Sequence, residues 1–172
     1  MQPAGYRRTA IRSQMEYENM EIGSAREDDA TQILALQKLC FQSQAMLYND
    51  FGMPPLTQTL ESLEKDIRTQ TVLVARAGNG ITGSVRARMI DGACHVERLI
   101  VHPGLQGRGL GTRLMQEIEA RFPAAERYEL FTGHRSENNL RLYEHLGYNR
   151  FAETIESQRL TLFHLEKKPL KT

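Results

Sequence analysis

The chain has 172 residues, of which 40% are hydrophobic and 25% are charged, and its formal net charge is +1. This length and composition predict a soluble globular protein that folds without disulfide support. The small net charge provides no global field to recruit nucleic acid or an anionic membrane, and no apolar run is long enough to cross a bilayer. We therefore expect a cytoplasmic protein with neither nucleic-acid nor membrane partners.

Residues that bind metals or form disulfides are few. Cys40 and Cys94 both stand in apolar surroundings, so we expect free, buried thiols. The five histidines form no H-x-x-x-H pair, and no metal is expected. The stretch 1–14 carries arginines, no acidic residue and no apolar segment. Residues 1–18 are therefore predicted to be a disordered leader rather than a secretory signal, with a transit peptide as the less favoured alternative. Residues 19–172 are expected to form a single domain.

The first part of this domain is predicted to be a strand followed by two helices. The strand lies around Ile22, and apolar residues at helical spacing follow over 26–41. One glycine and two prolines interrupt the pattern and predict a connection over 43–56. A second helix is expected over 57–70, where apolar residues again recur on one face.

The middle of the chain changes to strands. The stretch 71–101 reads as three antiparallel strands, because Gly-Asn-Gly at 78–80 and Asp-Gly at 91–92 are hairpin signals. The third strand runs from about residue 93 to 101. A glycine-rich loop follows and leads into a helix over 109–122.

The C-terminal part begins with a strand over 126–133 and a helix that starts at Ser136 and stops at Gly147. Two closing strands are expected near 148–151 and 160–165. This order of elements predicts a mixed α/β (α+β) fold: a mostly antiparallel central sheet of about six to seven strands, flanked by about four helices.

The sequence LQGRGLGTRL, residues 105–114, places three glycines at the start of a helix, although glycine weakens a helix by about 1 kcal/mol relative to alanine. The first-turn N–H groups have no intrahelical acceptor, and the helix dipole adds positive charge, so a diphosphate fits this position. The spacing matches neither the P-loop nor the G-x-G-x-x-G dinucleotide fingerprint. From the loop alone, a glycine-rich turn without a ligand is an equal alternative.

Two segments resemble signatures of the GNAT superfamily of N-acetyltransferases. In VERLIVHPGLQGRGLGTRLM, the residues Gln106, Gly109 and Gly111 stand at the Q/R-x-x-G-x-G/A positions, and LYEHLGY at 142–148 is similar to a later family segment. The resemblance covers about 20–167. It implies the GNAT fold, in which the strand before the loop splays from the strand after the helix and opens a slot for acetyl-CoA.

The resemblance also implies which residues bind this cosubstrate. The main chain of Leu99, Ile100 and Val101 is expected to bond to pantetheine, and the loop is expected to hold the pyrophosphate. The loop residues concerned are Gln106, Gly107, Arg108, Gly109, Leu110, Gly111 and Thr112. Many family members carry a pantetheine-contacting asparagine seven positions before the tyrosine of the later segment. Here that position is Ser136, so either Ser136 or Asn139 is expected to make the contact.

Three side chains are the candidates for catalysis. Tyr143 stands where the family tyrosine contacts the CoA sulfur and gives a proton to the departing thiolate, while its ring is expected to pack in the core. Glu97 and His95 alternate along one strand, so their side chains share a face and either can act as general base, with Glu97 favoured. The alternatives are an ion pair of Glu97 with Arg86 or Arg88 and an ordinary hydrogen bond for His95.

These features predict an enzyme that moves the acetyl group of acetyl-CoA to a primary amine by direct attack in a ternary complex. The amine itself is not identified. Tyr48, Asp50 and Phe51 are candidates for its site, or belong to an ordinary connection between helices. The alternatives are a non-catalytic acyl-CoA-binding sensor and a toxin-like relative that acetylates charged tRNA. A homodimer is a further expectation, because dimers are common among relatives.

Overall fold

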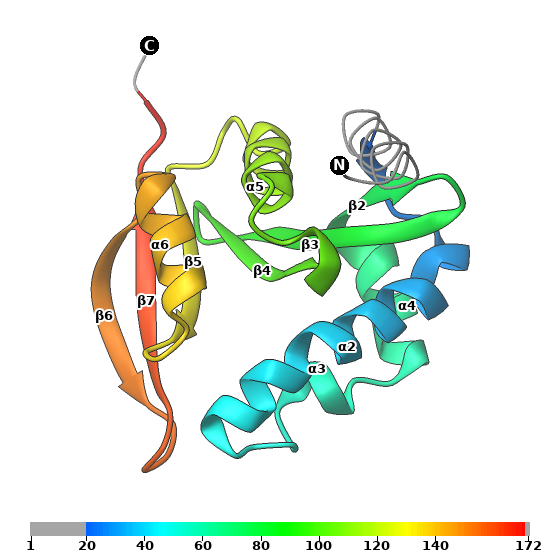
Figure 1. Ribbon diagram of the computed structural model, residues 1–172. Helices are drawn as coiled ribbons and strands as arrows, with labels where there is room; N and C mark the ends of the chain where they lie inside the picture. Colours follow the sequence, from blue (N-terminus) through cyan, green and yellow to red (C-terminus); the bar gives the residue numbers. More distant parts are fainter. Residues whose placement is uncertain (1–19, 171–172) are drawn as a thin grey trace, which may run out of the picture.

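Residues 20–170 are described by a computed structural model (Figure 1). The predicted leader, 1–18, lies outside these residues. The elements in chain order, with η marking short 3-10 helices, are β1 (Glu21–Ser24), η1 (Glu27–Asp29), α2 (Ala30–Tyr48), α3 (Pro54–Thr57), α4 (Leu60–Thr69), β2 (Thr71–Ala77), β3 (Gly80–Ile90), β4 (Ala93–Val101), η2 (Pro103–Leu105), α5 (Leu110–Ala120), β5 (Arg127–Gly133), α6 (Glu137–His145), β6 (Asn149–Ile155) and β7 (Thr161–Lys167).

The seven strands form one sheet in the order β1-β2-β3-β4-β5-β7-β6. Neighbouring strands are antiparallel except for β4 and β5, which are parallel. The parallel pair needs a crossover, which α5 provides on one face of the sheet. The predicted mixed, mostly antiparallel sheet is confirmed, and five α-helices accompany it in the described chain.

β4 and β5 pair over a short distance only. Three residue pairs join them, and the last pair is His95 with Glu129. Beyond this point β5 continues to Gly133 beside β7, whereas β4 continues to Val101 beside β3. The main-chain groups of β4 from Val96 onward that face β5 therefore have no partner strand there, and the predicted splay is confirmed.

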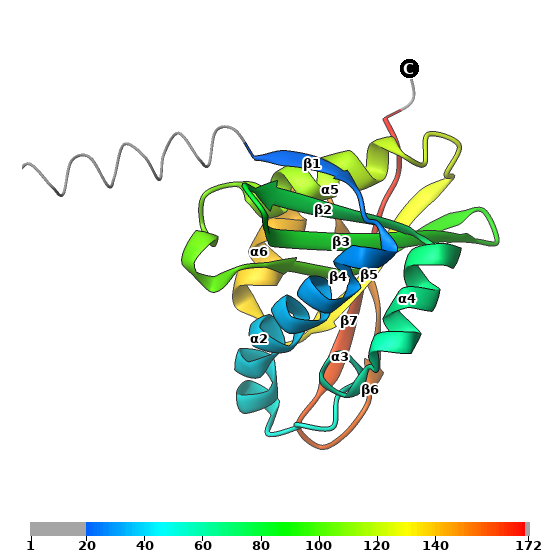
Figure 2. The ribbon, with the colours of Figure 1, turned by 90° about the vertical axis from the view of Figure 1, so that its right-hand side faces the viewer.

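Helices cover both faces of the sheet (Figures 1 and 2). Figure 2 shows α2 and α4 across the face that lies opposite α5. Alternation along β3 divides its side chains between two cores, because Val85 and Ala87 pack toward α5 and α6 whereas Ser84 and Arg86 point the other way. The α5 side buries Leu110, Leu114, Met115, Ile118 and Tyr143, and the α2 side buries Ile33, Leu36, Leu63 and Ile100.

The connection predicted over 43–56 is partly helical. α2 continues to Tyr48 and ends where Asn49 adopts a left-handed conformation, with φ 49°. Ala45 and Tyr48 are both buried, three residues apart, so the apolar face of the helix persists past the predicted end. Residues 54–57 add one helical turn, α3, with proline at its start.

Candidate active site

A cavity of about 710 Å³ lies where β4 and β5 separate. Its walls come from α2, the end of β4, the loop before α5, the first turn of α5 and α6. The predicted cofactor-binding residues that line it are Leu99, Ile100, Val101, Gln106, Gly107, Gly109, Leu110, Gly111, Thr112 and Asn139. The structure thus brings the loop and the strand edge together in one hollow. Arg108, Ser136 and Tyr143 lie outside this lining.

The three glycines of the loop have different physical roles. Gly107 and Gly109 have φ values of 74° and 86°, in the left-handed region that favours glycine. Gly109 is the N-cap of α5 and offers no side chain to the first-turn N–H groups. Gly111 is needed for packing as well, because a Cβ there would lie 3.3 Å from Leu142 of α6. Two glycines therefore shape the loop, and the third allows α5 to approach α6.

Side chains fix the last residue of β4. The carbonyl oxygen of Val101 accepts hydrogen bonds from Gln106 Nε2 at 3.1 Å and from Cys40 Sγ at 3.3 Å. Burial raises the pKa of Cys40 to about 11, so this cavity-lining thiol stays protonated at neutral pH. The signature glutamine thus folds back onto the strand and holds the loop against it.

The two candidates for the pantetheine contact lie in different surroundings. Ser136 is buried at the N-cap position of α6, but its hydroxyl makes no capping hydrogen bond. It donates instead to Gln44 Oε1 at 2.7 Å and lies 3.0 Å from the Tyr48 hydroxyl. Asn139 is half-buried and lines the cavity. Asn139 also has a protein partner, since its Nδ2 lies 3.5 Å from Thr132 Oγ1, but of the two residues it is the one on the cavity wall.

Tyr48 connects α2 to the end of β5. Its hydroxyl accepts a hydrogen bond from the Arg135 N–H at 2.9 Å, in addition to the contact with Ser136. A Cβ at Gly133 would collide with the tyrosine ring and hydroxyl, so this crossing requires glycine. We call Tyr48, Gly133, Arg135 and Ser136 the Tyr48 bridge. Asp50 and Phe51, the other candidates from this stretch, are exposed.

Tyr143 packs in the core between α6 and the sheet, with 7% of its surface exposed. Its ring centroid lies 6.0 Å from that of Tyr148, in an edge-to-face arrangement. Burial raises the pKa of Tyr143, so its phenol keeps its proton at neutral pH. The neighbouring Leu142 lines the cavity, whereas Tyr143 belongs to the buried core.

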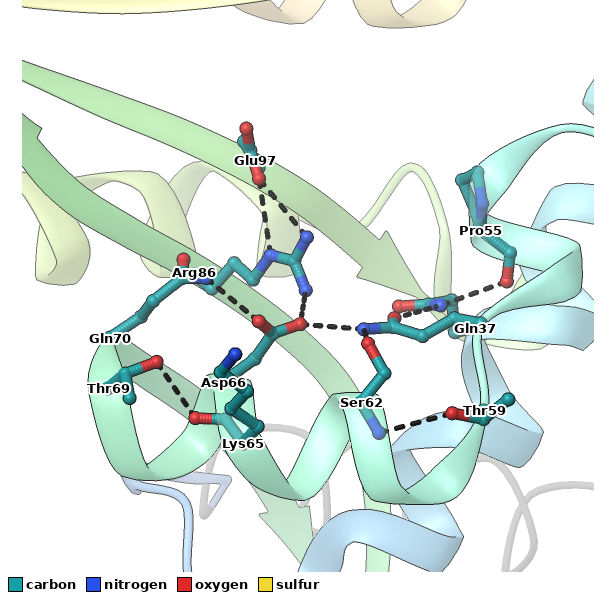
Figure 3. Close-up of polar contacts among 11 residues, drawn as sticks. Gln37, Pro55, Thr59, Ser62, Lys65, Asp66, Thr69, Gln70, Arg86 and Glu97 are labelled. Carbon is teal, nitrogen blue, oxygen red and sulfur yellow. Dashed lines mark hydrogen bonds and ion pairs between the residues drawn. The ribbon is translucent and has the colours of Figure 1, made fainter.

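Glu97 belongs to an ion cluster on the α4 side of the sheet (Figure 3). Arg86 Nη2 lies 3.1 Å from the Glu97 carboxylate, and Arg86 Nη1 lies 2.5 Å from Asp66 on α4. We call these residues the Asp66–Arg86–Glu97 cluster. The side chain of Arg86 is 9% exposed, whereas that of Glu97 is 25% exposed. The ion pair therefore holds the carboxylate while solvent still reaches it.

His95 lies at the closed end of the splay. Its Nε2 is 3.5 Å from a carboxylate oxygen of Glu129, its pairing partner on β5. Glu129 in turn accepts a hydrogen bond from Arg127 Nε, with an N–O distance of 2.5 Å. His95 thus faces the carboxylate of Glu129, whereas Glu97 faces the guanidinium of Arg86. Neither side chain lines the cavity.

A β-bulge that the sequence pattern did not predict follows Glu97. Arg86 pairs with Glu97, but Ser84 pairs with Ile100, so β4 contains one extra residue. Arg98 has φ 54°, an uncommon value for a residue other than glycine. The signal in the sequence is Glu97 followed directly by Arg98, because strict alternation would turn one of two adjacent charges toward an apolar core.

The bulge aims two charged side chains at the same side of the sheet. Glu97 reaches the Asp66–Arg86–Glu97 cluster, and the guanidinium carbon of Arg98 lies 5.9 Å from the ring centroid of Phe41 on α2. Leu99 and Val101 turn to the opposite side and pack near Gly111 of α5. β4 thus presents the two charges and the buried Ile100 on the α2 side, and only apolar side chains on the α5 side.

Some further groups complete the description of residues 20–170. Both cysteines are free; Cys94 is buried, as predicted, whereas Cys40 is only half-buried. In this part of the chain no three His, Cys, Asp or Glu side chains are grouped as metal ligands. None of the helices there has the length and apolar character needed to span a bilayer.

Comparison with known proteins identifies the family. No curated protein has a significantly similar sequence. Among solved structures, PaiA N-acetyltransferase from Thermoplasma acidophilum, in complex with coenzyme A, is 17% identical with a TM-score of 0.75, over 88% of this chain and 99% of that one. YncA from Salmonella typhimurium, with its cofactor acetyl-CoA, is 22% identical with a TM-score of 0.71, over 87% and 94%. The ribosomal-protein-alanine N-acetyltransferase from Brucella melitensis is 20% identical with a TM-score of 0.67, over 87% and 99%. The family model of the acetyltransferase (GNAT) domain matches residues 48–169, and the chain therefore belongs to the GNAT acetyltransferase family.

Proposed function

We propose that this protein transfers the acetyl group of acetyl-CoA to a primary amine by direct attack in a ternary complex. The observation that carries the proposal is the cavity at the splay, which joins the unpaired edge of β4 to the glycine-lined start of α5. The solved PaiA and YncA structures, which share this fold, contain coenzyme A and acetyl-CoA. Membership of the GNAT family supports acetyl transfer as the reaction.

The residues present fit this cosubstrate. A diphosphate needs hydrogen-bond donors without side chains in the way, and the main chain over 107–112 offers them at the positive end of α5. The amide-containing pantetheine arm needs main-chain partners, and the edge of β4 at Leu99, Ile100 and Val101 offers these, apart from the Val101 carbonyl that Gln106 and Cys40 already occupy. Asn139 on the cavity wall is our choice for an additional pantetheine contact.

Three side chains would manage the protons. Acetyl-CoA supplies an activated acyl group on a sulfur leaving group. A lysine-like amine has a pKa of about 10.4 and must lose a proton before its nitrogen bonds to the acyl carbon. Glu97, favoured over His95, would take that proton directly or through water, and Tyr143 would donate its phenolic proton to sulfur as the carbon–sulfur bond breaks. The second proton that the nitrogen loses as the amide forms would restore the Tyr143 phenol. A backbone N–H near Val101 would stabilise the developing oxyanion.

The test is thiol release from acetyl-CoA by the purified protein over a panel of primary amines, with the acetylated product identified by mass. We expect Glu97→Gln to lower the rate by at least about tenfold, in the range of general-base catalysis. Glu153→Gln, at an exposed position on β6, is the matched control and should leave the rate unchanged. Coenzyme A binding without any thiol release would favour the sensor alternative. RNA retention at low salt would favour the tRNA-acetylating alternative.

Other expectations from the sequence stay predictions. These are the single domain over 19–172, cytoplasmic residence, a homodimer, and the lack of nucleic-acid, membrane and metal partners.

A further inference from the structure

Arg98 is a half-buried cation without an anionic partner in the described part of the chain. Its Nε is buried and has no hydrogen bond. Its guanidinium lies over the Phe41 ring, which supplies a face but no acceptor atom. Arginines that lose water in a protein are normally paired with carboxylates. No hydrogen bond or ion pair joins its terminal nitrogens to the described residues either, so the donors left for a ligand are those of the guanidinium end.

The nearby carboxylates are already engaged. Arg86 is bonded to both Asp66 and Glu97, so the Asp66–Arg86–Glu97 cluster uses its single guanidinium for two anions. Burial lowers the pKa of Arg98 to about 10, and the like charge of Arg86 contributes to the shift, while Glu97 and Asp66 oppose it. Protein groups thus compensate the Arg98 charge incompletely, and an added anion would be bound favourably.

The position of Arg98 links it to the candidate active site. Phe41, under the guanidinium, lines the cavity at the splay. Glu97, the favoured general base, is its neighbour in the chain, and the bulge aims both side chains at the same side. The φ of 54° is a strained value for arginine, costing about 1–2 kcal/mol, and such strain is concentrated at functional sites.

We infer that Arg98 binds a carboxylate of the acceptor, which makes the acceptor a small zwitterionic amine such as a free amino acid. The inference rests on the proposed function. Neither Glu97 nor Arg98 lines the cavity itself, but both turn to the side of the sheet where Phe41 does, so one small molecule bound beside Phe41 would meet the base and the cation together. The single positive charge of Arg98 matches the single negative charge of a carboxylate, whereas a phosphate dianion needs more hydrogen-bond donors than one guanidinium offers. A polyamine would place only positive charge beside Arg98.

The experiment compares acids with their amides, which keep the amine and lose the charge. The coenzyme A-saturated protein is titrated calorimetrically with each of the standard amino acids and with the corresponding carboxamides. We expect at least one acid to bind about tenfold or more tightly than its amide, a difference of about 1.4 kcal/mol. Arg98→Gln should remove this difference, and Arg98→Lys should retain part of it. Arg88→Gln is the matched control, because it removes an exposed cation from β3, the strand next to β4. This variant should leave the difference between acid and amide intact.

The calorimetric titration measures binding and needs no acetyl transfer, so it tests the Arg98 site separately from the proposed function. Equal binding of acids and amides, or no binding of any acid, by the wild-type protein overturns the Arg98 site even if no variant folds. The Arg98 site is also overturned if Arg98→Gln and Arg88→Gln reduce the difference in affinity between acid and amide by the same amount. Acetylation of amides as fast as acids overturns the site and leaves the transferase proposal standing. Acids that bind through Arg98 with no thiol release support the site and contradict the transferase proposal.

Discussion

The two sides of β4 beyond the splay present different chemistry. Toward α5, Leu99 and Val101 are apolar and the adjoining loop is rich in glycine, so the groups available to a ligand are main-chain atoms. Toward α2 and α4, Glu97 and Arg98 present charged side chains, the first to Arg86 and the second to Phe41, which lines the cavity. We refer to these as the cofactor side and the acceptor side, following the proposed function.

The difference bears on which features can vary among proteins of this fold. Structures only 17% and 22% identical to this chain keep the fold with TM-scores of 0.75 and 0.71. A site made of main-chain atoms needs the fold and a few glycines, so it tolerates such divergence. A site made of charged side chains depends on the individual residues. We therefore expect acceptor preference to be set on the α2 and α4 side.

The largest expected effect is on the acceptor side and concerns stability. Arg86→Met leaves the Asp66 and Glu97 carboxylates without their shared cation, and we expect the free energy of unfolding to fall by about 3 kcal/mol. Chemical denaturation measures this change. The control Arg88→Met removes an exposed arginine from the same strand and should cost less than about 0.5 kcal/mol. Equal losses in the two variants would show that the cluster adds nothing.

The next effect is on catalysis. Tyr143→Phe keeps the packed ring and removes the proposed proton donor, so kcat should fall by roughly 10- to 100-fold with the Kd for coenzyme A unchanged. Because burial raises the pKa of Tyr143 above its usual 10, the wild type keeps this proton at alkaline pH and the ratio of the two rates should hold from neutral pH to about pH 10. Tyr148→Phe is the control, since its hydroxyl bonds to Glu119. An unchanged rate in Tyr143→Phe would remove this residue from the mechanism.

A smaller effect tests the cofactor side. Gly109→Val places a branched side chain at φ 86° beside the first-turn N–H groups, so coenzyme A binding should weaken by at least about tenfold, or about 1.4 kcal/mol. Calorimetric titration with coenzyme A measures the loss. Gly23→Val makes the same change on β1, where a Cβ meets no atom within 4 Å, and should not alter affinity. Normal affinity in Gly109→Val would contradict the assignment of the loop.

Local sequence signals predicted most of the fold, since each element carries its own pattern. The turn at 91–92 has φ values of 48° and 80°, as its Asp-Gly sequence indicates, and Gly147 stops α6 with φ 91°. The C-terminal part of α2 was missed because breakers at 52–55 suggested an earlier end. Burial of Ala45 and Tyr48 keeps those turns helical, and that packing is a tertiary effect.

The candidate site was predicted unevenly for the same reason. The loop from 105 to 112 is local and carries a family signature, so the sequence placed it on the cavity. For Glu97 the sequence offered an ion pair with Arg86 as one reading, and the structure contains that pair. The turn of Arg98 toward the acceptor side depends on a register shift between two strands. The adjacent charges at 97 and 98 indicate a break in alternation, but the pairing with β3 decides where the extra residue lies. The partners in the Tyr48 bridge are nearly ninety residues apart in the chain.

The smallest expected effect lies where the two sides are joined. Tyr48→Phe removes the hydroxyl that contacts Ser136 and Arg135 while keeping the ring, so the free energy of unfolding should fall by about 1 kcal/mol. Ser136→Ala removes the other end of one contact. If the hydroxyls interact, the double variant should lose less than the sum of the single losses in urea denaturation. Additive losses would mean that the two hydroxyls act independently, and the end of α2 would then be held against β5 by ring packing over Gly133 and by the separate hydrogen bonds of Arg135 and Ser136 to α2.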